Sequence, residues 1–149
     1  MIAVGDGVDV KVSIQSVVKP FLYIYALQKG LAPSDISYIE PTAMHFNTDA
    51  VLQPESHKSR PGHPLNNAGA ISSSGAIDQF EDFLAFMRRL TGNSKLSVLE
   101  DVYTSEMATN ANNRAIAMRL VATGRFSTIE DGMRALDNYT RACAIGVTP

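Results

Sequence analysis

Two residues near the N-terminus, Ser16 and Lys19, have the types and the spacing that serine-based acyl transfer requires. A serine hydroxyl is a weak nucleophile until a nearby base accepts its proton. Because residues three apart lie on one face of a helix, the amine of Lys19 can reach over Ser16. The N-terminus of a helix also stabilises developing negative charge by up to ~1 kcal/mol. The spacing predicts a serine nucleophile with a lysine base; the alternative is a helix-capping serine beside a solvated lysine.

The residues that follow predict a helix that holds this pair in place. Apolar side chains occur on all sides of residues 17–28, which is typical of a buried central helix. Pro20 is tolerated only in the first turn, so the helix must begin close to Ser16. Gly30 is a natural end for it. The sequence therefore places Ser16 at the N-terminal tip of a buried helix.

The rest of the chain predicts an α+β protein that is predominantly helical. Valine and isoleucine alternate with polar residues over positions 8–14, which indicates a short half-buried strand. Residues 105–113 are expected to form a polar connection. Apolar spacing and end signals predict helices over residues 33–39, 77–90 and 114–123 and from Thr128 onward.

Residues 67–75 are nearly all small, which indicates that the backbone approaches a neighbour closely. Either this stretch packs tightly against another helix, or it forms a wall of a site that carries the amide of Asn67. The side chains predicted to face the core in the helices that follow are Phe80, Phe83, Phe86, Leu90, Met133, Leu136, Tyr139 and Cys143.

Composition excludes several classes of function. The chain has 149 residues and 45% hydrophobic residues, which is enough for one globular domain with a core. Its net charge of −2 gives no electrostatic footprint for nucleic acid. No apolar run approaches the ~18 residues of a membrane span, and the N-terminus lacks the pattern of a signal peptide. We therefore expect an intracellular protein of the cytoplasm, with the mitochondrion as an alternative.

Metal binding and disulfide chemistry are not predicted. His45, His57 and His63 lack neighbouring cysteines or carboxylate pairs, so solvent-exposed histidines are favoured over a metal site. Cys143 is the only cysteine, so it cannot form an internal disulfide, and its apolar surroundings predict a buried filler residue.

Five sequence blocks, in this order, resemble the serine-dependent glutaminases. They are residues 13–20 (SIQSVVKP), 40–41 (EP) with 46–47 (FN), 64–71 (PLNNAGAI), 105–106 (SE), and 113–117 (NRAIA) followed by Tyr139 and Cys143. The resemblance implies a β-lactamase/transpeptidase-like fold. It also implies hydrolysis of L-glutamine to L-glutamate and ammonia, with no metal or organic cofactor.

The same resemblance implies roles for individual residues. Ser16 is expected to be the nucleophile and Lys19 its general base. The substrate is expected to contact Ser16, Asn67, Glu106, Asn113 and Tyr139, with Glu106 pairing with the α-ammonium group.

Each of these binding residues also has a structural alternative. Glu106 could cap a helix, and Asn113 could be the N-cap of a helix that starts at Arg114. Tyr139 could be a core aromatic whose hydroxyl bonds a carbonyl.

The chain departs from the family pattern in its length and at several positions. Family members have a catalytic domain about twice as long, so residues 1–149 are expected to be a partial domain that lacks its N- and C-terminal parts. No Lys-[Ser/Thr]-Gly segment occurs, although it belongs to the site in penicillin-recognising folds. Smaller departures fall at Thr42, Ala43, His63, Asn66 and Asn112.

Two other interpretations remain open on the sequence. One is a non-catalytic truncated remnant, whose helix faces lack the layer they pack against. The other is a different serine acyl-transfer hydrolase of the penicillin-recognising fold. The resemblance further implies a homo-oligomer.

Overall fold

The computed structural model describes residues 10–38 and 60–147, and helices dominate this part of the chain. In chain order they are a 3-10 turn, η1 (Gln15–Val18), then α1 (Lys19–Gln28), α2 (Pro33–Ile36), α4 (Asn67–Ser74), α5 (Phe80–Thr91), α6 (Glu100–Thr109), α7 (Ala111–Ala122) and α8 (Ile129–Cys143). Three short strands, β1 (Val12–Ser13), β2 (Ser97–Val98) and β3 (Ile145–Val147), form an antiparallel sheet in the order β1-β3-β2. The predicted α+β class with little sheet is confirmed.

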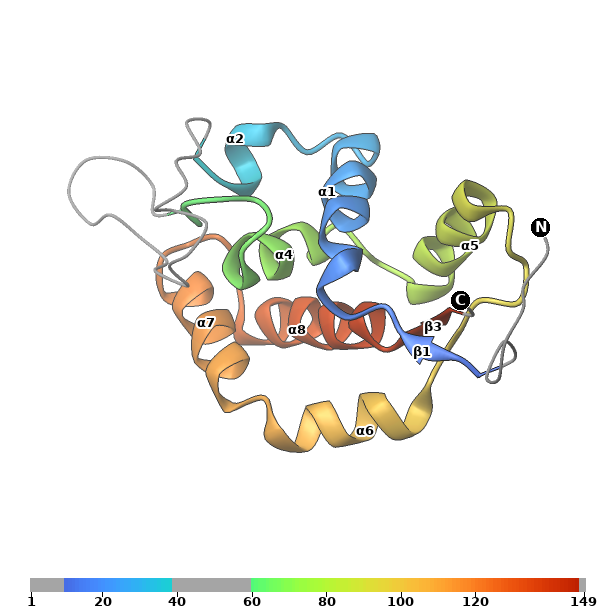
Figure 1. The fold of residues 1–149 in the computed structure, drawn as a ribbon. Coiled ribbons are helices and arrows are strands. Elements are labelled where there is room, and N and C mark those ends of the chain that lie inside the picture. Colours follow the sequence, from blue (N-terminus) through green and yellow to red (C-terminus); the bar gives the residue numbers. More distant parts are fainter. Residues whose placement is uncertain (1–9, 39–59, 148–149) are drawn as a thin grey trace.

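Helix α8 lies at the centre of the fold, in contact with α4, α6, α7 and η1 (Figure 1). Its inward face is the predicted one, because Leu136, Tyr139 and Cys143 are buried and Met133 packs against the core. The helix begins as the sequence predicts, because the hydroxyl of Thr128 accepts a hydrogen bond from the backbone amide of Asp131 in the first turn. The elements η1, α4, α6 and α7, which carry candidate site residues, therefore pack directly on α8. Helix α1, which carries Lys19, packs on α4 and η1.

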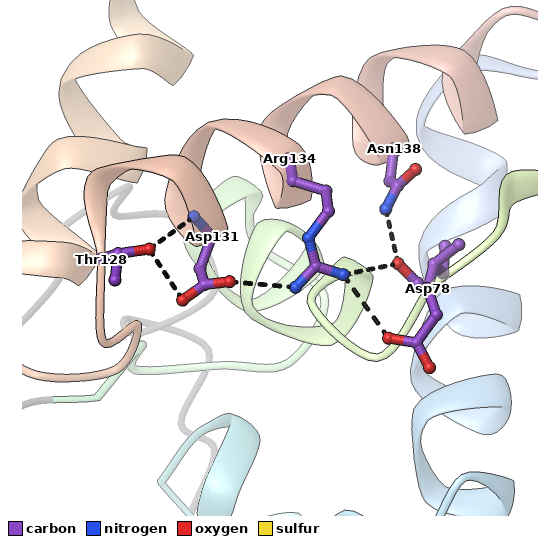
Figure 2. A network of polar contacts seen from close by, with 6 residues as sticks. Asp78, Thr128, Asp131, Arg134 and Asn138 are labelled. Atoms are coloured by element: carbon purple, nitrogen blue, oxygen red, sulfur yellow. Dashed lines mark hydrogen bonds and ion pairs between the residues drawn. The ribbon is translucent and has the colours of Figure 1, made fainter.

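A chain of polar contacts fixes the start of α8 to the loop between α4 and α5 (Figure 2). Arg134 donates Nη2 to Asp131 Oδ1 across 3.1 Å and Nη1 to the carbonyl oxygen of Ile77 across 3.2 Å. The same Nη1 pairs with Asp78 at 3.5 Å. Asn138 Nδ2 donates to the Ile77 carbonyl as well, across 2.9 Å. Because Ile77 follows α4, this network holds α4 against α8.

Helix α1 starts at Lys19, directly after η1, with Pro20 in its first turn as predicted. The prediction that it is buried on all sides is wrong. Its inner side chains are Leu22, Tyr25 and Ala26, whereas Ile24 and Leu27 on its outer side are 42% and 36% exposed. Val17, in the preceding η1, is 66% exposed. The reason is packing on one side only, against α4 and α5, which leaves the outer apolar face uncovered.

Helix α4 confirms the close approach that its small residues predict. All its residues from Ala68 to Ser74 are buried. A Cβ atom at Gly69 would lie 2.1 Å from the carbonyl oxygen of His63, so only glycine fits there. Asn66, one of the positions that depart from the family pattern, is the N-cap: its Oδ1 accepts from the Gly69 amide across 2.7 Å.

Helix α5 confirms most of its predicted inner face. Phe83 and Phe86 are buried and Phe80 packs against the core. Gly92 ends the helix in the left-handed conformation, with φ of +68°. Leu90 was predicted to face inward and instead is exposed, because it lies in the last turn of the helix, after the last buried residue, Met87.

The connection predicted over residues 105–113 is wrong, because most of it is helical. Helix α6 spans Glu100–Thr109, and none of its residues is buried, so it has no apolar stripe from which periodicity could reveal it. Helix α7 begins at Ala111, three residues before the predicted start. Its end before Gly124, which has φ of +76°, is as predicted.

The N-terminal strand and the second helix are shorter than predicted. Strand β1 comprises only Val12–Ser13, and Val10 and Val12 are exposed rather than half-buried. Helix α2 ends at Ile36. Within residues 10–38 and 60–147, no helix is both long and apolar enough to span a bilayer.

The predicted solvent exposure of the histidines can be compared with the structure at one position. His63 is only partly exposed, and its Nδ1 accepts the backbone amide of Leu65 across 3.0 Å. His45, His57 and the blocks at 40–41 and 46–47 lie outside the described residues.

Candidate active site

Ser16 and Lys19 lie at the junction of η1 and α1, as the sequence predicts. Ser16 is exposed and Lys19 is partly buried. The residue before the serine, Gln15, has φ of +52°, and it is the only non-glycine residue with a positive φ in the described part of the chain. This left-handed conformation costs about 1–3 kcal/mol, and such strain tends to cluster at functional sites.

The carboxamide of Asn67 joins three other predicted site residues. Its Oδ1 accepts from Lys19 Nζ across 2.7 Å and from the Tyr139 hydroxyl across 3.2 Å. Its Nδ2 donates to Asn113 Oδ1 across 3.3 Å. These four side chains come from α1, α4, α7 and α8. Both interpretations of the small-residue stretch therefore apply, because α4 packs tightly and also presents the Asn67 amide.

Asn113 lies inside α7, so the alternative that it is an N-cap is wrong. The N-cap of α7 is Asn110, whose Oδ1 accepts from Arg114 Nε across 2.7 Å. The helix starts earlier than the sequence predicts, and this places Asn113 on the face toward Asn67.

Tyr139 links the serine to this cluster. Burial raises the pKa of its phenol far above the ordinary value, while a hydrogen bond with the Ser16 hydroxyl works in the opposite direction. The phenol therefore stays protonated, and it donates to Asn67 Oδ1. The alternative of a core aromatic is half right: the ring is buried, but its hydroxyl bonds a side-chain amide rather than a backbone carbonyl.

Cys143 is buried as predicted, yet it is more than filler because it touches the site. Burial raises the pKa of its thiol to about 12, a hydrogen bond with Tyr139 opposes that rise, and the charge of Glu106 adds to it. The positive charge of Lys19 lowers the pKa of the thiol. Its position one turn after Tyr139, on the same face of α8, was the available signal in the sequence.

Glu106 is held by a residue that sequence reasoning did not assign to the site. Gln15 donates Nε2 to Glu106 Oε1 across 2.7 Å and to Ser13 Oγ across 2.9 Å. Glu106 lies within α6 and not at its start, so the helix-cap alternative is wrong. The bond places the carboxylate beside the residue that precedes Ser16.

The arrangement provides the groups that acyl transfer needs. An exposed hydroxyl, a lysine amine, a carboxylate and two carboxamides converge from five elements, η1, α1, α4, α6 and α7, around the phenol of α8. In the described ranges, no group of three His, Cys, Asp or Glu side chains could hold a metal ion. The groups at hand are suited to a serine nucleophile and to recognition of a polar, charged substrate.

Solved structures of glutaminases share this fold. A probable glutaminase from Bacillus subtilis superposes with a TM-score of 0.79 at 27% identity, over 95% of this chain and 47% of its own. The structure of Mglu in its glutamate form gives 0.78 at 28% identity, over 95% and 33%. A covalent complex of a Bacillus subtilis glutaminase with 5-oxo-L-norleucine, formed by reaction with 6-diazo-5-oxo-L-norleucine, gives 0.67 at 24% identity, over 93% and 43%. The fold is thus the β-lactamase-like fold of these glutaminases.

Sequence relatives give the same family. The glutaminase of Clostridium tetani is 34% identical over 148 residues, which cover 94% of this chain and 47% of the relative. That of Colwellia psychrerythraea is 37% identical over 142 residues, which cover 91% and 45%. The chain spans about half the length of these relatives. The Glutaminase family model matches residues 1–149, and the chain belongs to the glutaminase family.

Proposed function

We propose that this chain carries the nucleophile and the general base of a glutaminase, which hydrolyses L-glutamine to L-glutamate and ammonia through a serine acyl-enzyme. The observation that carries the proposal is the connected set of side chains centred on Asn67 and Tyr139. In it, Lys19 and the Tyr139 hydroxyl share the Asn67 oxygen, and the exposed Ser16 acts on the pKa of the same phenol. Membership of the glutaminase family supports the choice of substrate.

The first half of the reaction forms the acyl-enzyme. Ser16 Oγ attacks the side-chain carboxamide carbon of L-glutamine while neutral Lys19 Nζ accepts the hydroxyl proton. The C–N bond of the tetrahedral intermediate then breaks. The leaving nitrogen accepts from Lys19 the proton that came from the serine, and it departs as ammonia. Asn67 keeps the amine of Lys19 in place throughout, since its Oδ1 is already the acceptor for Nζ.

The second half releases the product. Water attacks the ester carbon of the acyl-enzyme, Lys19 accepts a proton from this water, and the proton returns to Ser16 Oγ as L-glutamate leaves. The proton that Ser16 loses thus leaves with ammonia, the attacking water supplies the proton that restores the hydroxyl, and neither step needs a redox partner.

Substrate recognition is assigned to the charged and amide groups around the serine. The carboxylate of Glu106 is suited to the α-ammonium group, in a charge-assisted hydrogen bond. The amides of Asn67 and Asn113 are suited to the polar oxygens of the substrate. The Tyr139 phenol, on whose pKa the Ser16 hydroxyl acts, is suited to orienting that hydroxyl.

We infer that residues 1–149 are part of a glutaminase catalytic domain, since they cover 47% of the Clostridium tetani relative and 45% of the Colwellia psychrerythraea relative. A cytoplasmic location and a homo-oligomer stay predictions. Light scattering of the purified chain measures the second.

The test is L-glutamine-dependent ammonia release by the purified chain, with Ser16→Ala as the matched control. Because Ser16 is exposed, the alanine variant should fold and unfold like the parent while losing turnover. A folded parent without turnover favours the non-catalytic alternative. Covalent labelling of Ser16 by a fluorescent penicillin, in place of glutamine turnover, favours a penicillin-recognising hydrolase.

A further inference from the structure

Helix α6 carries Glu106 but buries none of its residues. Buried apolar side chains are what normally fixes a surface helix on its core. Apart from the Gln15 bond to its carboxylate, the place of Glu106 relative to Ser16 therefore depends on the contacts that α6 makes with α8, which runs beside it (Figure 1).

A closed cluster of three side chains provides such a contact. The hydroxyl of Tyr103 on α6 donates to Asp137 Oδ1 on α8. Arg141 Nε donates to Asp137 Oδ2 across 2.9 Å, and its guanidinium lies 4.7 Å from the centre of the Tyr103 ring. Burial and the bond to Asp137 both raise the pKa of the Tyr103 phenol, so it remains a donor at neutral pH.

The cluster joins the two helices that carry the site residues Glu106 and Tyr139. Tyr103 is three residues before Glu106, which places the two on one face of α6. Asp137 and Arg141 flank Tyr139 on α8. The cluster thus connects the helix that carries the carboxylate of Glu106 to the helix that carries the phenol of Tyr139, which donates to Asn67.

We propose that Tyr103, Asp137 and Arg141 are positioning residues that set Glu106 at the distance from Ser16 at which it receives the α-ammonium group of the substrate. The inference rests on the proposed function. The three residues touch no reacting atom, and they act through Glu106 alone.

The experiment is a set of steady-state kinetics with Tyr103→Phe, which deletes one oxygen and keeps the ring beneath Arg141. KM for L-glutamine should rise about tenfold, which corresponds to a loss of ~1.4 kcal/mol, while kcat stays within about twofold. Asp137→Asn should act in the same direction. The matched control is Asp78→Asn, which removes a carboxylate paired with another arginine of α8, Arg134, and should leave KM unchanged.

A double-mutant cycle separates positioning from general destabilisation. In a Glu106→Gln background, Tyr103→Phe should cause no further rise in KM, because the residue it acts through is already neutral. Equal effects in both backgrounds, or a fall in kcat with KM unchanged, overturn the proposal.

Amide hydrogen exchange keeps this test separate from that of the proposed function. If the parent chain neither turns over nor binds L-glutamine, the proposed function fails on that result, and the role of Glu106 in binding fails with it. If the parent binds or turns over glutamine, Tyr103→Phe should speed exchange in α6 and leave α7 unchanged. Unchanged exchange in α6 overturns the cluster as the device that holds this helix.

Discussion

Lys19 Nζ lies 2.7 Å from Asn67 Oδ1, which joins residues 48 positions apart in the chain. The same oxygen accepts the Tyr139 hydroxyl, and an amide oxygen has the two lone pairs that both donors need. A third bond, from Asn67 Nδ2 to Asn113 Oδ1, holds the carboxamide in this orientation. One carboxamide thus fixes the lysine and the phenol at the same point beside Ser16.

This shared acceptor predicts that Asn67→Ala lowers kcat/KM for L-glutamine by about a hundredfold or more, because amine and phenol lose a common partner. Tyr139→Phe removes only one of the two donors to Asn67, so its effect on the position of Lys19 should be smaller. Steady-state kinetics on both variants measure the difference. An Asn67→Ala enzyme with parental kcat/KM would show that this oxygen is not needed.

The general-base role of Lys19 predicts that Lys19→Met lowers kcat by about 10²–10⁴-fold, which is the usual contribution of a positioned acid–base group. Methionine keeps the length and apolar stem of the side chain and removes the amine. Thermal unfolding monitored in parallel confirms that the variant is folded. Retention of kcat within tenfold would assign the proton transfer to another group.

The close approach at Gly69 predicts a stability difference between two glycine substitutions. Gly69→Ala places a Cβ 2.1 Å from the His63 carbonyl oxygen and 2.6 Å from Pro64 Cα, so backbone must shift, at a cost of about 3 kcal/mol. Gly92→Ala meets no atom within 4 Å and costs only the left-handed strain at φ of +68°, about 1 kcal/mol. Urea unfolding of the two variants should rank them in this order, and equal values would contradict the tight contact.

The raised pKa of Cys143 predicts that stability declines in alkaline solution. The folded thiol keeps its proton to about pH 12, whereas an unfolded thiol loses it near pH 9. Above pH 9 the unfolded state is therefore stabilised, by up to ~1.4 kcal/mol per pH unit for this group. Its contribution is fully present below pH 9 and is lost as pH rises toward 12.

Urea unfolding between pH 8 and pH 10 measures this slope before the buried phenols add to it. Cys143→Ala should flatten the dependence on pH, whatever its effect on stability at pH 8. An identical slope in both proteins would show that the thiol ionises in the folded state.

Local signals in the sequence were enough for the elements whose ends or faces carry distinctive residues. Thr128 with acidic neighbours marked the start of α8, Pro20 limited the start of α1, and Gly92 and Gly124 marked ends. Ser16 and Lys19 came from their spacing, whereas the binding residues came from the family resemblance. The convergence of Lys19, Asn113 and Tyr139 on Asn67 depends on long-range contacts that no local pattern contains.

The errors have physical causes that the sequence does not show. Helix α6 has no buried face, so apolar periodicity could not reveal it. The outer stripe of α1, including Ile24, is apolar but uncovered, and composition cannot distinguish it from a buried side. Gln15, with its strained φ, bonds Glu106, which is 91 residues away, so no local pattern reveals this contact.

The central claim is that Ser16 is the nucleophile, and intact-protein mass spectrometry after reaction with 6-diazo-5-oxo-L-norleucine tests it most directly. This glutamine analogue forms a covalent complex with a Bacillus subtilis glutaminase. Peptide mapping should find one added 5-oxo-norleucine group, on Ser16, in the parent protein, much slower labelling in Lys19→Met and none in Ser16→Ala. An unlabelled parent, or equal labelling of Ser16→Ala, would contradict the account.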